Sequence, residues 1–331
     1  MSGRILTNMA FFQSEVWKGA TESICREGES PDTLGAMRQA WRLLKLRRRG
    51  GAVAAVVTMG PRASLAYGVG CGVLGLRSRQ VLCEVFLDEA REGEWTWRAK
   101  RRLFQWVAGR SLGVIVNSSA ERRRVAVRFG IPEEKVVFVP LCTTVAEVRQ
   151  EVEQLGAAGR PQVLTAGRTG RDLATFWEVA RRVPEAEFVA IVGRGQALPA
   201  GEVPKNLRVV RECAWEAYLE QLGQAAVVAL PLLASERSTG QVVLLEAMSL
   251  GKAVVTTRTT GTVDYVREGE TGLLVAPGDA LGMAKAVQGL LANRERRQTM
   301  GARALVQVQA ELLPDAHAAR RLAAVRELAG E

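Results

Sequence analysis

Short apolar runs alternate with longer amphipathic stretches along most of the chain. The run at 52–59 and the shorter runs at 163–166 and 188–192 are almost continuous in apolar residues, which is typical of strands buried on both faces of a parallel sheet. Stretches with apolar residues at helical spacing, such as 63–74, follow them. This alternation predicts an α/β chain built on parallel sheets. We expect further strands over similar segments: 3–8, 80–87, 114–116, 136–139 and 226–231.

The segment 238–255 predicts a turn, a helix and a buried strand in succession. Ser238 or Thr239 is suited to cap the helix at its start, and Gly251 suits the position just after its end. Residues 253–255 then begin a strand. This order of elements is the usual one in an α/β domain.

Two residues of this helix point to a ligand site. Gly240 lets a ligand approach the backbone at the start of the helix, where N–H groups without intrahelical partners suit a diphosphate. Glu246 lies about two turns into the helix, where a carboxylate can accept hydrogen bonds from hydroxyls of a sugar or a ribose. The alternative is an ordinary amphipathic core helix.

This segment resembles the donor-binding signature of the family 4 retaining glycosyltransferases (glycosyl transferases group 1), which have the GT-B fold. The usual form is E-x(7)-E followed by A-M-A-x-G-x-P-V-V. Glu246 matches the second Glu, which binds the ribose in the family, whereas the first Glu falls on Ser238. Glu236 is two residues too early to replace it. This departure leaves open which sugar is bound and whether transfer itself is affected.

A second motif of the family follows the predicted strand 163–166. The family strand ends in G-R with a Lys a few residues later, and the two cations neutralise the donor diphosphate. Gly167 and Arg168 match, and Arg171 stands closer than the usual Lys as its substitute. Arg grips phosphate in a bidentate manner, so the exchange is chemically reasonable. The alternative is a surface loop with two solvated arginines.

The resemblance implies further donor-site residues. Gly193 lies in a match to the family's I-V-G-x-G, and Trp215 stands where the family contacts the base, although it can equally be a core residue. Arg168, Arg171 and Glu246 are the implied catalytic residues. The remaining implied donor contacts surround the start of the helix: Ser238, Thr239, Gly240 and Gln241.

The resemblance covers roughly residues 112–300 and is weak over 1–110, where the family's glycine-rich first loop is missing. It implies a GT-B protein, with two Rossmann-like domains whose parallel sheets face a cleft. We expect an acceptor-binding domain at 1–145, a donor-binding domain at 146–314, and a C-terminal helix at 315–331 that crosses back to the first domain. Asp88 or Glu89, at the end of a predicted strand, would contact the acceptor hydroxyl or serve only as a cap.

The charge of the chain is uneven. Residues 1–145 hold 23 Lys and Arg against 13 Asp and Glu, so the whole formal surplus of +10 lies in the first half. Around 95–107 the basic residues mix with aromatic ones, a combination that suits an anionic membrane surface. The predicted membrane-facing residues are Trp95, Trp97, Lys100, Arg101, Arg102 and Trp106. A second such stretch runs over 38–49; a plain basic surface and single-stranded nucleic acid are the alternatives, and we do not expect nucleic acid.

Other chemistry is sparse. The five Cys form no C-x-x-C pair and are expected to be reduced and mostly buried. The one histidine, His317, is expected to be structural or exposed. No D-x-D motif occurs, so we expect neither a metal nor a cofactor; the nucleotide-diphosphate sugar, of UDP or GDP type, is a substrate. Without a signal-peptide pattern or a membrane-spanning run, we expect a cytoplasmic location, peripheral on the inner face of the membrane.

These features predict a metal-independent glycosyltransferase that moves a sugar to a hydroxyl acceptor. The resemblance implies retention of configuration, and the acceptor would be a sugar or a lipid-linked sugar of cell-envelope polysaccharide or glycolipid synthesis. Two alternatives remain open: a sugar-nucleotide epimerase or hydrolase on the same fold, and a non-catalytic nucleotide-sugar-binding homologue or partner subunit. The base, the sugar, the acceptor and the oligomeric state are not determined by the sequence.

Overall fold

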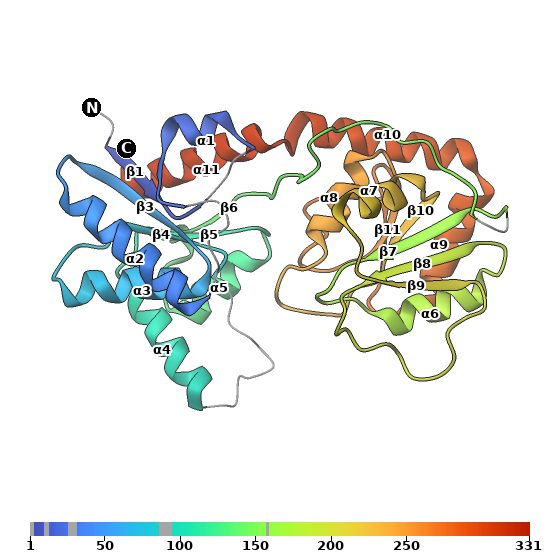
Figure 1. Cartoon of the computed structure of the whole chain (residues 1–331), viewed down its shortest axis with the longest axis horizontal. Coiled ribbons are helices and arrows are strands. Elements are labelled where there is room, and N and C mark those ends of the chain that lie inside the picture. The colour runs from blue at the N-terminus through green and yellow to red at the C-terminus, as the bar shows by residue number, and fades with distance from the viewer. Residues whose placement is uncertain (1–2, 10–12, 26–31, 86–94, 157–158) are drawn as a thin grey trace. The chain divides into compact units, whose positions relative to one another are not determined.

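The computed structural model describes residues 3–9, 13–25, 32–85, 95–156 and 159–331 (Figure 1). The chain forms two compact units. Unit 1 consists of Met1–Pro140 together with Pro314–Glu331, and unit 2 consists of Leu141–Leu313. Each unit has its own parallel sheet and its own buried core, as the strand–helix alternation predicted.

The sheet of unit 1 has six parallel strands in the order β2-β1-β3-β4-β5-β6. They are β1 (Arg4–Thr7), β2 (Glu22–Ser23), β3 (Val53–Met59), β4 (Gln80–Cys83), β5 (Gly113–Val116) and β6 (Val136–Phe138). The helices are α1 (Glu15–Ala20), α2 (Thr33–Arg48), α3 (Pro61–Val73), α4 (Trp95–Gly109), α5 (Glu121–Phe129) and α11 (Pro314–Ala329), with a 3-10 turn at Glu133–Lys135.

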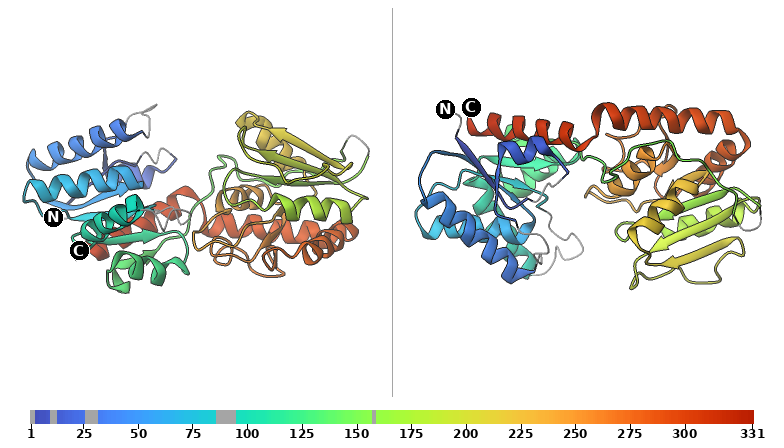
Figure 2. Two further views of the ribbon diagram at one scale, coloured as in Figure 1. Left: turned by 90° about the horizontal axis from the view of Figure 1, so that it is seen from below. Right: turned by 45° about the horizontal axis from the view of Figure 1, so that its top comes forward.

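Both faces of this sheet are covered by helices. Side chains alternate along a strand, so Val56 of β3 packs with α2 and α3, whereas Val57 packs with α1 and α11. In Figures 1 and 2, α2, α3 and α4 lie side by side in one layer, and α1 and α11 lie on the other face. Helix α11 gives Ala318, Leu322 and Val325 to the core, which confirms the predicted return of the C-terminal helix to this unit.

The sheet of unit 2 also has six parallel strands, in the order β12-β11-β10-β7-β8-β9. The strands are β7 (Gln162–Ala166), β8 (Glu187–Val192), β9 (Leu207–Arg211), β10 (Val227–Leu230), β11 (Ala253–Thr257) and β12 (Leu273–Val275). The helices are α6 (Leu173–Arg182), α7 (Trp215–Gln224), α8 (Gln241–Ser249), α9 (Ala280–Ala292) and α10 (Arg294–Glu311).

The core of unit 2 has two layers. Leu164 of β7 and Val228 of β10 pack with α7, α8 and α10, whereas Val163 and Val227, on the opposite face of the same strands, pack with α6 and α9. This double layer explains why the strands are almost continuous in apolar residues.

Some predicted boundaries and burials need correction. Neither Ser238 nor Thr239 caps α8: its N-cap is Gly240, with a φ of 89° and no capping side chain. Strand β4 ends at Cys83 rather than running to 87. The cysteines are less buried than expected, since only Cys71 and Cys83 are fully buried and Cys213 is exposed.

Candidate functional site

The candidate site lies where the strand order of the unit 2 sheet reverses direction. From β7 the chain builds outward through β8 and β9, and then returns to place β10 on the other side of β7. In such sheets ligands bind beyond the carboxyl ends of the two strands at the reversal. The loops there are residues 167–172, after β7, and residues 231–240, after β10.

These two loops are held together by backbone hydrogen bonds. The Asp172 N–H donates to the Pro231 carbonyl over 3.0 Å, and the Leu233 N–H donates to the Gly170 carbonyl over 2.9 Å. A Cβ on Gly170 would lie 2.9 Å from the Thr239 hydroxyl oxygen, so the loops also touch at a second point. The predicted arginine loop and the start of α8 therefore form one surface.

The start of α8 depends on Gly240. Its φ of 89° is a conformation that side-chain-bearing residues rarely adopt, and a Cβ there would lie 2.6 Å from Leu232 Cδ1. Because no side chain caps the helix, the first-turn N–H groups remain suited to an anion. The structure thus places Gly240 at the start of α8, where the sequence predicted it, and its contact with Leu232 is a packing reason for the glycine.

The two arginines differ in how they are held. Arg168 is exposed, and its side chain runs beside Gly193, where an added Cβ would lie 3.2 Å from Arg168 Cγ. Arg171 is half-buried and donates hydrogen bonds to the carbonyls of Ala166 and Thr169, the second over 3.0 Å. Burial lowers the Arg171 pKa to about 10, and the nearby Tyr218 and Glu246 oppose that shift. Arg171 therefore shapes its own loop, whereas Arg168 is available to a ligand.

Gly167 is needed for this arrangement. Its φ is 118°, and a Cβ at this position would lie 2.2 Å from an Arg171 terminal nitrogen. The glycine therefore makes room for the buried part of the Arg171 guanidinium. The structure gives a packing reason for a residue that the sequence singled out only by its motif.

Glu246 is almost fully buried, at 1% exposure, on α8. The Tyr218 hydroxyl donates a hydrogen bond to Glu246 Oε2, and the Thr144 hydroxyl donates one to Oε1 over 2.7 Å. Burial raises the pKa of Glu246, while these two hydrogen bonds and the charge of Arg171 lower it in part. Burial and the neighbouring carboxylate also raise the pKa of Tyr218. The sequence did not indicate Tyr218 or Thr144, because neither lies near Glu246 in the chain.

The other predicted donor residues differ in their surroundings. Trp215, the first residue of α7, is 45% exposed with its ring centroid 5.5 Å from that of Tyr218, so it is not a core residue. Ser238 and Gln241 are buried, and the Gln241 amide donates to the Tyr265 hydroxyl over 3.2 Å. The Thr239 hydroxyl is buried without a hydrogen-bond partner in the described part of the chain.

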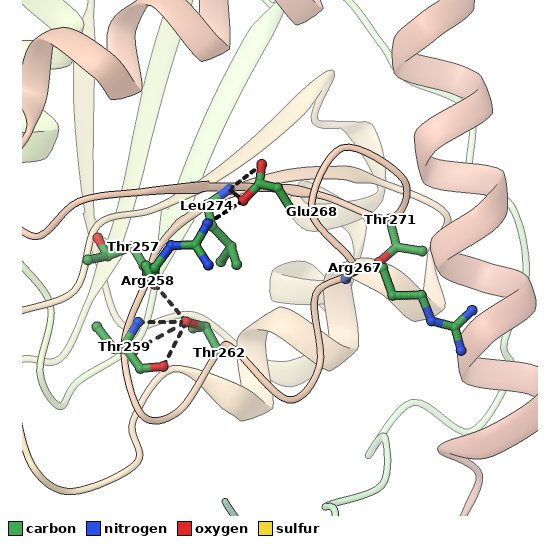
Figure 3. Close-up of polar contacts among 8 residues, drawn as sticks. All are labelled: Thr257, Arg258, Thr259, Thr262, Arg267, Glu268, Thr271 and Leu274. Carbon is green, nitrogen blue, oxygen red and sulfur yellow. Dashed lines mark hydrogen bonds and ion pairs between the residues drawn. The ribbon is translucent and has the colours of Figure 1, made fainter. Parts of the chain in front are cut away.

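A threonine-rich loop after β11, which the sequence did not single out, supports residue 239. A Cβ on Gly261 would lie 2.2 Å from the Thr239 carbonyl oxygen, so the two backbones are in direct contact. In Figure 3 the Thr262 hydroxyl donates to the Thr257 carbonyl over 2.7 Å and accepts from the Thr259 N–H over 3.0 Å. This network fixes the loop that contacts the backbone of Thr239, just before α8.

The other end of the same loop is fixed by Glu268. Its carboxylate pairs with Arg258 over 2.8 Å and accepts from the Leu274 N–H over 3.1 Å, as Figure 3 shows. The Thr271 hydroxyl accepts from the Arg267 N–H over 3.0 Å. The loop between β11 and β12 is therefore closed by side-chain contacts at both ends.

The candidate residues of unit 1 are placed only in part. Asp88 and Glu89 lie outside the described residues. On α4, Trp95 is 79% exposed, and Lys100, Arg102 and Trp106 are exposed as well. Trp97 is the exception: it is 4% exposed and packs in the core with Phe104 and Phe129, so its prediction as a membrane-facing residue is wrong. Arg101 is half-buried, with its guanidinium 5.7 Å from the centre of the Trp97 ring.

The described residues also bear on metal binding and on membrane crossing. Among the described residues, no group of three or more His, Cys, Asp or Glu is arranged to hold a metal ion. Within the same residues, no helix is both long enough and apolar enough to cross a bilayer.

Comparison with known proteins agrees with this geometry. Residues 160–293 match the family described as Glycosyl transferases group 1. The structure of HepE from Anabaena in complex with UDP superposes with a TM-score of 0.69 at 13% sequence identity, covering 97% of this chain and 98% of that one. The chain has the GT-B fold. The match to this family lies wholly within unit 2, which spans Leu141–Leu313.

Curated relatives match over part of their length. The chain is 33% identical over 154 residues to the sulfoquinovosyl transferase SQD2 of Arabidopsis thaliana, covering 44% of this chain and 29% of that protein. It is 37% identical over 152 residues to the lipopolysaccharide core biosynthesis glycosyltransferase LpsE of Rhizobium meliloti, covering 44% of each. The matching part thus spans less than half of either relative.

Proposed function

We propose that this protein transfers a sugar from a nucleoside diphosphate sugar, of UDP or GDP type, to a hydroxyl of an acceptor. The observation that carries the proposal is the direct joining of the Arg168 loop to the start of α8 at the strand reversal. A diphosphate bound at these loops would be held by the Arg168 guanidinium together with the first-turn N–H groups of α8. The similar structure of HepE is a complex with UDP, which supports a uridine nucleotide as the donor.

The residues of the site would bind different parts of the donor nucleotide. Arg168 would contact the diphosphate. Arg171 would add positive charge to the site while its hydrogen bonds hold the shape of the loop. Glu246 would accept hydrogen bonds from the ribose, because a carboxylate offers about four lone-pair sites and Tyr218 and Thr144 occupy only two. Trp215 is exposed at the start of α7 and would stack on the base. The hydroxyl of Thr239, which lacks a partner in the described region, would contact the phosphate or the sugar.

The reaction would proceed by front-face attack with retention of configuration. The acceptor oxygen attacks the anomeric carbon on the face from which the diphosphate departs. The bond from the anomeric carbon to the phosphate oxygen breaks, and the acceptor proton passes to the departing phosphate. Arg168 and the helix N–H groups stabilise the charge that develops on that phosphate. No protein nucleophile is needed. The anomeric proton coupling of the product, measured by NMR, tests retention.

A panel of nucleotides tests the donor site. Purified protein is heated with UDP, GDP, ADP, CMP or dTDP, each without metal. We expect one diphosphate to raise the melting temperature by mass action, and Arg168→Ala to remove most of that rise. Arg194→Ala, in the neighbouring loop and paired with Glu212 over 3.1 Å, is the matched control and should keep it. No rise with any nucleotide would contradict the proposed donor site.

One observation favours a second candidate, a non-catalytic nucleotide-sugar binder. Ser238, buried at 7% exposure, stands where the signature has its first Glu. A binder would show the melting-temperature rise but no sugar transfer to any acceptor, including lipid-linked sugars. Release of free sugar without an acceptor would instead indicate a hydrolase, and conversion of the donor sugar would indicate an epimerase.

We also propose that unit 1 touches an anionic membrane through the α2–α4 surface, defined as the exposed residues Trp41, Lys45, Trp95, Lys100, Arg102 and Trp106. Helices α2, α3 and α4 lie side by side in one layer (Figure 2). The ammonium of Lys45 lies 4.9 Å from the centre of the Trp41 ring, which itself is 61% exposed. Tryptophan favours the lipid–water interface, and lysine or arginine near an anionic surface contributes about 1 kcal/mol each. A lipid-linked acceptor would be reached from such a surface, and the name of LpsE supports a cell-envelope acceptor.

Vesicle sedimentation tests this surface. Protein is spun at low salt with vesicles of phosphatidylglycerol or of phosphatidylcholine. We expect binding to the anionic vesicles only, with a loss of at least about tenfold in Trp95→Ala/Lys100→Gln/Arg102→Gln. The control Lys285→Gln removes an exposed lysine from α9 of unit 2 and should bind like the wild type. Protein that remains in the supernatant with anionic vesicles at low salt would overturn the proposal.

A further inference from the structure

Unit 2 has a cavity of about 270 Å³ at the edge of its sheet opposite the candidate donor site. It lies at the amino-terminal ends of β10 and β11, whereas the donor loops follow the carboxyl ends of β7 and β10. The lining comes from three sources: the extended segment 150–153, the residues just before the two strands, and helix α10. Because it is somewhat smaller than the roughly 300–1,000 Å³ of drug-sized pockets, it suits a small metabolite.

The walls of this cavity are fixed by hydrogen bonds to backbone carbonyls and by close packing. The Gln150 side-chain amide donates to the Gly251 carbonyl over 2.9 Å, and the Glu151 N–H donates to the Leu250 carbonyl over 3.0 Å. Helix α10 packs tightly behind, since a Cβ on Gly301 would lie 2.0 Å from the Gly251 carbonyl oxygen. The cavity is therefore shaped before any ligand enters.

The carboxylates around the cavity have arginine partners. Glu153 accepts from Arg297 Nε over 2.9 Å and from a terminal nitrogen over 2.8 Å, and it pairs with Arg294 over 3.2 Å. Glu151 pairs with Arg149 over 2.6 Å. These two acidic groups are neutralised by residues other than the lysine that lines the same space.

That lysine, Lys252, is the uncompensated charge. It is 3% exposed, and its ammonium donates to the Glu151 backbone carbonyl over 2.7 Å. In the part of the chain that the structure describes, no carboxylate lies within ion-pair distance of it. An ammonium has three N–H donors, so this single bond leaves two without a protein acceptor among the described residues. Burial lowers the pKa of Lys252 to about 8. The charge of Arg297 lowers this pKa as well, whereas the charges of Glu153 and Glu151 raise it.

We propose that this cavity binds the carboxylate or phosphate group of a small metabolite through the ammonium of Lys252. An oxyanion supplies the missing acceptors and the missing negative charge together, and the apolar Ala225, Ala226 and Ala302 line the space for the rest of the molecule. The site lies apart from the donor loops and does not depend on the proposed transferase activity.

Sulfate titration at constant ionic strength tests the site, because sulfate carries the same charge throughout the range used. The amide signals of Gly251 and Ala253 are followed by TROSY NMR, with those of Gly167 and Gly240 reporting separately on the donor loops. We expect saturable shifts at Gly251 and Ala253 that weaken at least about tenfold in Lys252→Met. Lys285→Met, an exposed lysine of the same unit, is the matched control and should keep them.

The pH dependence in the wild-type protein gives a second readout that needs no variant. The groups facing Lys252 are Glu151 and Glu153 from the extended segment and Arg297 from α10. Because burial lowers the pKa of Lys252 to about 8, sulfate affinity should be highest well below pH 8 and fall above it. Gly251 and Ala253 signals that stay still while those of Gly240 move would overturn the proposal. The proposal also fails if Lys252→Met binds sulfate as tightly as the wild type, or if sulfate affinity does not change up to pH 9.5. Lys252 would then serve only as a hydrogen-bond donor to the Glu151 carbonyl.

Discussion

The Tyr218 hydroxyl donates a hydrogen bond to the buried carboxylate of Glu246. The two residues come from adjacent helices, α7 and α8, and Trp215 lies one turn before Tyr218. The proposed ribose ligand and the proposed base-stacking residue are therefore joined through one tyrosine. A change at Tyr218 should affect both stability and nucleotide binding.

Replacing Tyr218 with Phe should destabilise the protein by about 1–3 kcal/mol, because a buried carboxylate loses a donor. Burial raises the pKa of Glu246, and the Tyr218 bond counteracts that rise, so the variant raises the pKa further. A carboxyl group whose folded pKa lies above its unfolded value stabilises the fold at low pH, and this stabilisation is lost as the pH rises through the folded pKa. The melting temperature of Tyr218→Phe should therefore lie further below that of the wild type at pH 8 than at pH 5.

Tyr67→Phe is the matched control for that measurement. The Tyr67 hydroxyl donates to the Ser78 carbonyl and accepts from Arg47, each over 3.0 Å, so neither of these two partners is a carboxylate. The melting temperature of Tyr67→Phe should lie below that of the wild type by the same amount at both pH values. If the same holds for Tyr218→Phe, the electrostatic account of Glu246 is contradicted.

Substitution of the two arginines of the donor loop should have different effects: one on nucleotide binding and the other on stability. Arg168→Ala should weaken nucleotide binding at least about tenfold and change stability by no more than about 0.5 kcal/mol, since the side chain is exposed. Arg171→Ala should lower stability by about 1–3 kcal/mol, because the Ala166 and Thr169 carbonyls lose their donor. Calorimetric titration with the preferred diphosphate and thermal melts measure the two effects. The assignment fails if Arg168→Ala unfolds at a much lower temperature while Arg171→Ala does not.

Gly167, in the donor loop after β7, and Gly195, in the loop after β8, should respond differently to substitution by alanine. Gly167→Ala should cost about 1–3 kcal/mol and lower nucleotide affinity, because φ is 118° and the new Cβ overlaps Arg171. Gly195→Ala has no atom within 4 Å of the new Cβ and should be nearly neutral. Chemical unfolding and nucleotide titration check both. Equal stability of the two variants would remove the packing role assigned to Gly167.

His317 should make unit 1 sensitive to acid. It is 3% exposed, its Nδ1 lies 2.5 Å from the Pro140 carbonyl oxygen, and burial with the charges of Arg321 and Arg320 lowers its pKa to about 3. A histidine with a lowered pKa stabilises the fold above its unfolded pKa of about 6.5, and this is lost as the pH falls towards the folded value.

The sequence holds a single histidine, so its ring signals in a long-range ¹⁵N NMR spectrum can be assigned without variants. We expect them to stay in the neutral form down to pH 5 or until the protein unfolds. His317→Asn, which keeps a side-chain donor, should flatten the loss of stability between pH 6.5 and 4. A ring that titrates near its ordinary pKa of about 6.5 in the folded protein would contradict this account.

Much of the fold could be predicted because buried parallel strands leave a strong pattern. Val53–Met59 and Glu187–Val192 are apolar on both faces, and the structure shows helices on both sides of each sheet. The start of α8 was harder, because a glycine in the left-handed region, rather than a hydroxyl side chain, occupies its N-cap. Trp97 was placed wrongly since one amphipathic helix carries tryptophans on both its buried and its exposed sides.

The candidate site could be predicted only where its residues share a local motif. Gly167, Arg168 and Gly240 lie in short loops next to strong strands, and the structure brings those loops together. Thr144 lies 102 residues from Glu246 in the chain, so spacing alone gives no signal for their contact. The backing of Thr239 by Gly261 is likewise a tertiary contact between backbones, which no side-chain pattern records.

Helix α11 has a consequence for the order in which the protein forms on the ribosome. Unit 1 takes its first strand from the start of the chain, but its core needs Ala318, Leu322 and Val325 from Pro314–Ala329. All of unit 2 is synthesised between these two parts. During translation, one apolar face of the first sheet therefore stays without its long covering helix until unit 2 has emerged, and nascent chains that stall before Pro314 would offer that face to chaperones.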